Sequence, residues 1–255
     1  MATALVLARR RSKSMPGKNL LEFHGRPLVA YPVMAAREAG LAAVLLSDGA
    51  ELLAVGEQFG ARTHRLPAEL CTDTGTIHAS LDHAIAALGL AEETVVALMG
   101  NSPTVCGATI RRALARHEAG DVTGVLTVAP VEDVHPWRLW QVAGERVRPF
   151  LGEVPRAAIN RQACAGCVRY DGGPMVFRGS YRPGPSIYPF LGAEIGCVVR
   201  DEFGLDVHTP ADLSVATWWL WLHRREWLPA DFEPPGYFAA VRGEGEHSWE
   251  ASEHG

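Results

Sequence analysis

The sequence lacks the features that mark membrane proteins and general nucleic-acid binders. No apolar run reaches the roughly 18 residues that a membrane-spanning helix needs. Basic residues are not in excess, because 24 Lys and Arg stand against 29 Asp and Glu, a net charge of −5 at pH 7. Proteins that bind the phosphate backbone of nucleic acids usually carry a basic excess. We therefore expect neither a membrane nor a nucleic acid as a partner.

The sequence is also expected to carry neither a secretory leader nor a disulfide framework. The first apolar segment is short and runs directly into arginines, which is unlike a signal peptide. The protein is therefore expected to be cytoplasmic, and its five cysteines, an odd number, are expected to be free thiols. Cys164 and Cys167 have CxxC spacing, which occurs in zinc and redox sites, but no second pair of ligands follows to complete a tetrahedral zinc site. A metal or redox role for this pair is the minor alternative.

What the sequence does contain is a repeated alternation of strand-like and helical segments. The chain has 255 residues, 47% of them hydrophobic, which is enough for a sizeable core. Strands are expected at 4–8, 43–46, 94–99, 122–128 and 193–199, and helices at 28–39, 51–59, 77–88, 108–118 and 210–227. Such units predict an α/β fold with a doubly wound, mostly parallel, Rossmann-like sheet.

One segment interrupts this alternation, and another follows it. Prolines, glycines and weak periodicity at 133–190 predict a small α+β insertion used for dimerisation. This insertion lies within a domain expected to cover 1–228. Residues 229–255 are rich in Pro, Gly and Glu and are expected to form a disordered tail.

A cationic loop follows the first expected strand. Five of its ten residues between 9 and 18 are basic, and Pro16-Gly17 predicts a turn there. Loops at the carboxyl end of the first strand of such sheets bind phosphates. Arg and Lys supply the charge, and backbone N–H groups near Gly17 can surround phosphate oxygens. The alternative is a solvated basic loop without a ligand.

Residues 8–19, A-R-R-R-S-K-S-M-P-G-K-N, resemble the nucleotide-binding signature of the acylneuraminate cytidylyltransferases, A-R-x-G-S-K-x-x-P-x-K-N. Residues 67–74, 98–103, 161–172 and 205–212 resemble further motifs of this family. Their order and spacing extend the resemblance over about residues 3–225.

The resemblance implies a Rossmann-like nucleotidyltransferase that acts as a homodimer. It would transfer CMP from CTP to an acidic small molecule and release pyrophosphate, with Mg²⁺, or Mn²⁺ in its place, as cofactor. The implied catalytic residues are Arg9, Lys18 and Asp206. The implied nucleotide-binding residues are Ala8, Arg9, Ser12, Lys13, Lys18, Asn19, Asp73 and Ser102.

The implied acceptor end departs from the family pattern. Met99 and Asn101 replace a glutamine and a threonine, and Asp171 replaces an asparagine. The acceptor is therefore expected to be an unusual sugar acid or an intermediate of a specialised pathway. The candidate acceptor-binding residues are Met99, Asn101, Arg161, Arg169 and Asp171. The two arginines suit a carboxylate or phosphonate, or alternatively an interface salt bridge.

Asp206 and His208 are the candidate metal ligands. They lie two residues apart at an expected strand end, so both can point to one face. Because Mg²⁺ prefers oxygen, His208 would be a ligand for an ion such as Mn²⁺, a neighbour of the ligands, or a general base. Alternatively, Asp206 caps the following helix and His208 is a surface residue.

Two departures leave other functions open. Leu66 stands where the family has an arginine near the base, which is compatible with another nucleotide such as GTP, although Arg65 is adjacent. His208 replaces the second aspartate of the metal motif. That change is compatible with a nucleotide-binding dimeric relative that has lost catalysis.

Overall fold

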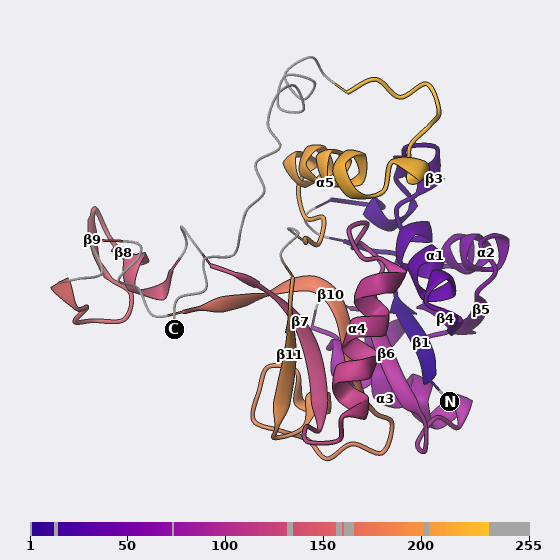
Figure 1. Ribbon diagram of the computed structural model, residues 1–255, viewed down its shortest axis with the longest axis horizontal. Helices are drawn as coiled ribbons and strands as arrows, with labels where there is room; N and C mark the ends of the chain where they lie inside the picture. Colours follow the sequence, from indigo (N-terminus) through magenta and orange to yellow (C-terminus); the bar gives the residue numbers. More distant parts are fainter. Residues whose placement is uncertain are drawn as a thin grey trace.

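A seven-stranded sheet forms the centre of the protein (Figure 1). The computed structural model describes residues 2–12, 15–72, 74–131, 135–156, 160, 166–200 and 204–234. Strand β10 is antiparallel to its neighbours β6 and β7, and the other pairs are parallel, which confirms the mostly parallel α/β fold. In spatial order the strands are β11 (Ile195–Val199), β7 (Gly124–Pro130), β10 (Val168–Arg178), β6 (Thr94–Met99), β1 (Ala2–Leu7), β4 (Ala42–Ser47) and β5 (Arg62–Arg65).

Helices cover both faces of this sheet. Successive side chains of β1 alternate between two cores: Ala4 and Val6 enter one, and Leu5 enters the other. The first core takes residues from α1 (Ala30–Glu38), α2 (Ala50–Gln58), α4 (Gly107–Glu118) and α5 (Pro210–His223), and the second from α3 (Ile77–Leu88). Burial on both faces explains why β1, β4 and β6 are almost entirely apolar rather than alternating.

Two helix starts follow local sequence signals. The Thr76 hydroxyl accepts a hydrogen bond from the Ala79 N–H (3.1 Å) and caps α3. Thr209 and Asp212 form a capping box at the start of α5, with Pro210 at the first helical position. Asp212 therefore stabilises the start of the helix.

The segment expected to be an insertion divides into two parts. Strands β8 (Trp140–Ala143) and β9 (Arg146–Pro149) form a hairpin that projects from the sheet (Figure 1). Strand β10, in contrast, is a central strand, so the projecting part is smaller than 133–190. Seven consecutive buried residues, 171–177, explain this position, because they need cover on both faces.

The end of the described chain packs against the short hairpin of β2 (Glu22–Phe23) and β3 (Arg26–Pro27). The rings of Phe232 and His24 meet edge to face, with centroids 5.1 Å apart. The remainder of the expected disordered tail, 235–255, lies outside the described residues. Trp219 and Trp221 of α5 are buried in the first core. Within the described ranges, no helix combines the length and apolarity needed to cross a membrane.

Candidate functional site

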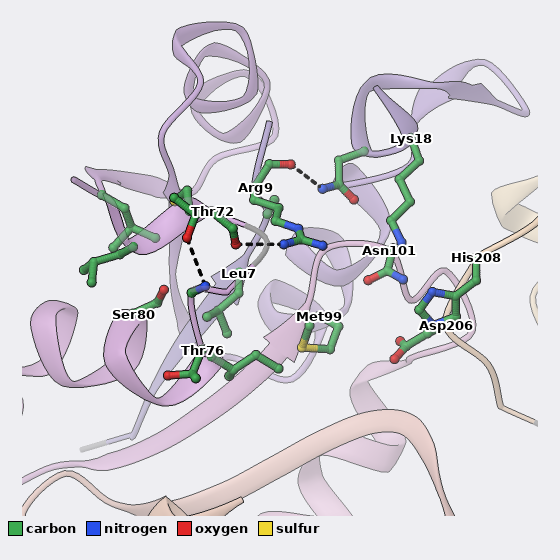
Figure 2. A pocket seen from close by; sticks show the side chains of 17 residues that line it. Leu7, Arg9, Lys18, Thr72, Thr76, Ser80, Met99, Asn101, Asp206 and His208 are labelled. Carbon is green, nitrogen blue, oxygen red and sulfur yellow. Dashed lines mark hydrogen bonds between the residues drawn. The ribbon is translucent and has the colours of Figure 1, made fainter. Parts of the chain in front are cut away.

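A cavity of about 320 Å³ lies at the carboxyl ends of β1 and β6 (Figure 2). The loops that follow these strands approach closely because Gly100 has no side chain. A Cβ there would lie 2.7 Å from the Ala8 Cβ and 2.8 Å from the Leu7 carbonyl oxygen. The volume is in the range of small-molecule sites. The predicted site residues that line the cavity are Ala8, Arg9, Lys18, Asn19, Met99, Asn101, Asp206 and His208.

Arg9 and Asn19 form one wall of this cavity. The Arg9 guanidinium donates to the Thr72 carbonyl (3.1 Å), as Figure 2 shows, and the Asn19 amide donates to the Arg9 carbonyl (3.0 Å). Asn19 is 6% exposed, and its Oδ1 has no hydrogen-bond partner among the described residues. Its donor half is therefore used by the protein, whereas its acceptor half has no partner among the described residues.

Lys18 reaches from η1 (Lys18–Leu20) to the segment after β11. Its ammonium donates to the Val207 carbonyl (2.9 Å). Burial lowers the pKa of Lys18 and Arg9 adds to this, whereas the nearby Asp206 carboxylate raises it. An anion bound beside Lys18 would favour its charged form.

Asn101 holds that same segment from the other side. Its side-chain amide donates to the Val207 carbonyl (2.9 Å), and its backbone carbonyl accepts from the Val207 N–H (2.9 Å). Val207 separates Asp206 from His208, so Asn101 and Lys18 together fix the backbone between the two candidate metal ligands. No local pattern indicates this pairing, since 106 residues separate Asn101 from Val207.

Asp206 lies next to Lys18 and Ser102. The Ser102 hydroxyl donates to Asp206 Oδ1. Burial raises the pKa of the Asp206 carboxyl, opposed by the Ser102 hydrogen bond and the charges of His208 and Lys18. A buried carboxylate that remains ionised gains from a nearby cation. Ser102 thus acts directly on Asp206.

A second cavity, of about 580 Å³, adjoins the first. Both cavities are lined by Asp206 and His208, so these two residues lie where the cavities meet. Arg169 lines only the second cavity, and its guanidinium donates to the carbonyls of Tyr170 and Gly204 (3.3 Å each). Asp206 therefore lies between two cavities, and Arg169 contributes to the second of them.

The Asp171 carboxylate makes its contacts inside the protein. It is fully buried and bonds to Thr127 and Arg200 inside the protein, although its residue contributes to the lining of the second cavity. Because its oxygens are engaged there, an acceptor cannot reach them without breaking a buried ion pair.

The other predicted residues are distributed around this centre. Ser12 lines a third, open cavity of about 570 Å³, together with Arg10, Arg11 and Gly17 of the cationic loop. Lys13, Asp73 and Arg161 lie outside the described residues, as does Cys164 of the CxxC pair.

Three residues outside the predicted set also contribute to the site. Thr72, Thr76 and Ser80 line the first cavity (Figure 2). Thr76 had a usable signal, because a threonine before a helical segment is a typical cap. Leu66 lines the cavity as well, whereas the adjacent Arg65 donates to the Asp48 carbonyl (3.0 Å).

In the part of the chain that the structure describes, no group of three or more His, Cys, Asp or Glu side chains is placed to hold a metal. Asp206 and His208 alone would leave most coordination positions to a bound ligand. Mg²⁺ is commonly held in this way, by one or two carboxylates and the phosphates of a nucleotide.

The sequence profile of the cytidylyltransferase family matches residues 3–136, slightly more than half of the chain. The chain belongs to this family. The matched residues include the cationic loop, most of β1 and all of β6, and they supply most of the lining of the first cavity, whereas Asp206 and His208 lie beyond the match.

Individual relatives agree with this assignment over part of their length. CMP-N,N'-diacetyllegionaminic acid synthase from Legionella pneumophila subsp. pneumophila (strain Philadelphia 1) is 32% identical over 157 residues, 58% of this chain and 66% of the relative. Bifunctional protein GlmU from Trichlorobacter lovleyi is 36% identical over 134 residues, 50% of this chain and 28% of the relative. The chain therefore spans less than two thirds of these relatives.

A solved structure has a fold similar to that of this member of the cytidylyltransferase family. CMP:2-keto-3-deoxy-manno-octonic acid synthetase complexed with CTP has a TM-score of 0.64 and 18% sequence identity to the chain. The match covers 88% of this chain and 99% of the other.

Proposed function

We propose that the protein is a CTP-dependent cytidylyltransferase that transfers CMP to an acidic sugar and releases pyrophosphate. The observation that carries this proposal is the pair of adjoining cavities that share Asp206 and His208. Family membership supports a cytidylyltransferase activity. The relatives named for diacetyllegionaminic acid and 2-keto-3-deoxy-manno-octonic acid support an acidic sugar as acceptor.

The first cavity would hold the nucleotide. Arg9 and Lys18 supply positive charge for the phosphates, and a protein catalyses such a transfer mainly by positioning the reactants and stabilising the developing charge. The unpaired Asn19 Oδ1 would accept a hydrogen bond from the ligand, such as one from the amino group of cytosine.

The second cavity would hold the acceptor. Its hydroxyl would lie near the shared edge and attack the α-phosphorus, the bond to the leaving pyrophosphate would break, and the hydroxyl proton would pass to a base. His208 lines both cavities and is the side chain best placed to accept that proton. Arg169, which lines the second cavity, offers a planar guanidinium for the acceptor carboxylate.

Mg²⁺ is the proposed cofactor, with Mn²⁺ as the alternative. The buried Asp206 carboxylate fits a hard cation, because its ionised form is otherwise destabilised by desolvation. His208 would be the second protein ligand only for an ion that accepts imidazole. When bound, the ion would supply charge stabilisation for the phosphates.

The same proposal includes a cytoplasmic location. It also includes assembly into a homodimer. The β8–β9 hairpin exposes large apolar side chains, a pattern typical of interaction surfaces. Trp140, Val142, Val147 and Phe150 are each at least 58% exposed. A second copy would cover this surface through a two-fold interface.

The test is pyrophosphate release with CTP, GTP, UTP and ATP, each with Mg²⁺ or Mn²⁺, against a panel of sugar acids. Release with CTP and an acid supports the proposal. Release with GTP in place of CTP would favour the alternative nucleotide that Leu66 motivates. Nucleotide binding by calorimetry without pyrophosphate release would identify a non-catalytic relative.

A further inference from the structure

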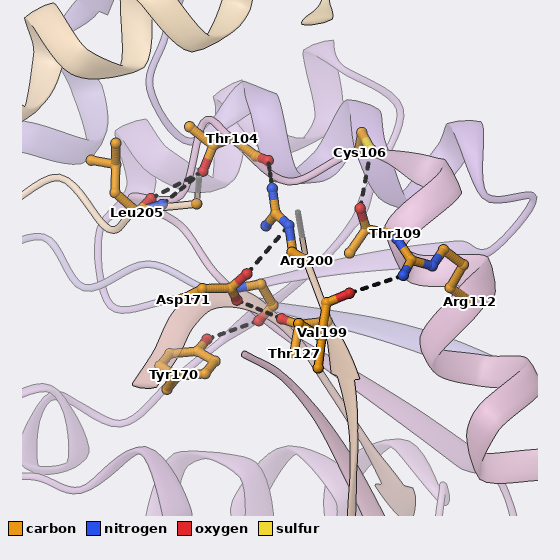
Figure 3. A network of polar contacts seen from close by, with 12 residues as sticks. Thr104, Cys106, Thr109, Arg112, Thr127, Tyr170, Asp171, Val199, Arg200 and Leu205 are labelled. Carbon is orange, nitrogen blue, oxygen red and sulfur yellow. Dashed lines mark hydrogen bonds and ion pairs between the residues drawn. The ribbon is translucent and has the colours of Figure 1, made fainter. Parts of the chain in front are cut away.

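A buried ion pair lies directly behind the site (Figure 3). Asp171 Oδ2 is 3.2 Å from Arg200 Nε, and both side chains are fully buried. The other carboxylate oxygen accepts from the Thr127 hydroxyl (2.6 Å) and the Gly173 N–H (3.0 Å). The pair therefore joins β10 to β7 and to the residue that follows β11.

Arg200 continues the network toward the site. Its guanidinium donates to the Thr104 carbonyl (2.9 Å). The Thr104 hydroxyl in turn accepts from the Leu205 N–H (3.0 Å) and donates to the Leu205 carbonyl (3.3 Å). Leu205 immediately precedes Asp206, so this chain of contacts, drawn in Figure 3, ends at the backbone of the candidate metal ligand.

Asp171 reaches the same carboxylate by a second route. The next residue, Gly172, has φ +77 and lies in the register shift of β10. A Cβ at Gly172 would lie 2.7 Å from Asp206 Oδ1 and 3.0 Å from Asp206 Cγ. The irregularity in β10 therefore places the Asp171 side chain against Arg200 and the Gly172 backbone against Asp206.

The chemistry of the pair favours a positioning role. A buried ion pair is weak as a source of stability, because desolvation of both charges offsets their attraction. Its contacts are directional, however, and they fix β7, β10, the loop after β6 and the segment 204–207 relative to one another. Apolar side chains would fill the space without fixing these orientations.

We propose that Asp171 and Arg200 are positioning residues, which hold the Asp206 carboxylate at the junction of the two cavities through Thr104 and Gly172. The functional consequence rests on the proposed cytidylyl transfer. In this proposal Asp171 positions Asp206 from the interior of the protein and does not contact the acceptor.

Hydrogen–deuterium exchange of the segment 204–208 tests this without any substrate. Thr104→Val keeps the side-chain shape and removes the hydroxyl that binds Leu205, whereas Thr104→Ser keeps the hydroxyl and is the matched control. We expect about tenfold faster exchange at 204–208 in Thr104→Val and no change in Thr104→Ser, with β1 protected in both; a tenfold change corresponds to about 1.4 kcal/mol. Equal exchange at 204–208 in the two variants would overturn the link through Thr104.

Asp171→Asn tests the ion pair itself. The amide keeps the shape but loses the charge opposite Arg200, and circular dichroism shows whether the variant folds. A folded variant is expected to show the same faster exchange at 204–208, and unchanged exchange overturns the proposal. If the variant does not fold, the result from Thr104→Val and Thr104→Ser decides.

Kinetics distinguish this proposal from the proposed function. In Thr104→Val, kcat is expected to fall about tenfold with KM for CTP within twofold of wild type, since misplacement affects the transition state more than nucleotide binding. A rise in KM alone would contradict positioning of Asp206. If wild type releases no pyrophosphate with any nucleotide and acid, the proposed function fails, whereas the exchange data still decide the positioning.

Discussion

The contact between Gly172 and Asp206 makes Gly172→Ala a sharp test of the site geometry. An added Cβ would lie 2.7 Å from Asp206 Oδ1, about 0.7 Å short of the 3.4 Å at which ordinary contact begins. The backbone cannot relieve this easily, because Gly172 has φ +77, a conformation that side-chain-bearing residues rarely adopt.

Two costs add in this variant, and a matched control separates them. The left-handed backbone costs alanine about 1–2 kcal/mol. Crowding against Asp206 adds about 1–3 kcal/mol, as is typical of overpacking. Gly25 has nearly the same φ, +76, but a Cβ added there would meet no atom within 4 Å, so Gly25→Ala carries the backbone cost alone.

Thermal unfolding measures the difference between the two variants. For a protein of this size, 1 kcal/mol shifts Tm by about 2–4 °C. Gly172→Ala is therefore expected to melt about 2–12 °C below Gly25→Ala. Its kcat for pyrophosphate release should fall by about tenfold or more, since 1 Å of misplacement can cost on the order of 10²-fold. Equal Tm values together with wild-type kcat in Gly172→Ala would refute the contact.

Four further outcomes follow from the site. Lys18→Met should lower turnover about 10²-fold through lost charge stabilisation, with the exposed Arg62→Met as a control that keeps wild-type turnover. Asp206→Asn should abolish turnover yet raise Tm at neutral pH. Burial raises the folded-state pKa of this carboxyl, so wild type loses stability as pH rises through that pKa. The stability advantage of Asp206→Asn over wild type should therefore vanish below the ordinary pKa of about 3.9. A lower Tm for Asp206→Asn than for wild type at neutral pH would contradict the raised pKa. His208→Asp should shift the metal preference toward Mg²⁺ if imidazole is a ligand, or lose rate with either metal if it is the base; an unchanged rate, metal preference and pH profile would exclude both roles. Trp140→Ser should weaken a dimer at least about tenfold in sedimentation, and a monomeric wild type at micromolar concentration would remove that surface from the proposal.

Local sequence signals determined the repeating units of the fold. Apolar runs such as 94–99 and the caps at Thr76 and Thr209 depend on neighbours within a few residues, so their elements can be recognised in the chain itself. The cationic loop could be recognised for the same reason, since its charges and its turn are contiguous in sequence. Arg9, Lys18 and Asp206 could be named before the structure and do line one cavity, but their roles remain predictions.

Only the tertiary structure decided what these residues contact. Strand β10 is antiparallel between two strands that precede it in sequence, and nothing local specifies that choice of partners. Asp171 was expected to face the acceptor, yet its carboxylate turns inward because Arg200 and Thr127 are there to compensate the buried charge. The sequence determined which acidic and basic side chains the protein has. The packing of segments about 30 to 190 residues apart determined which of them are paired in the interior and which line the cavities.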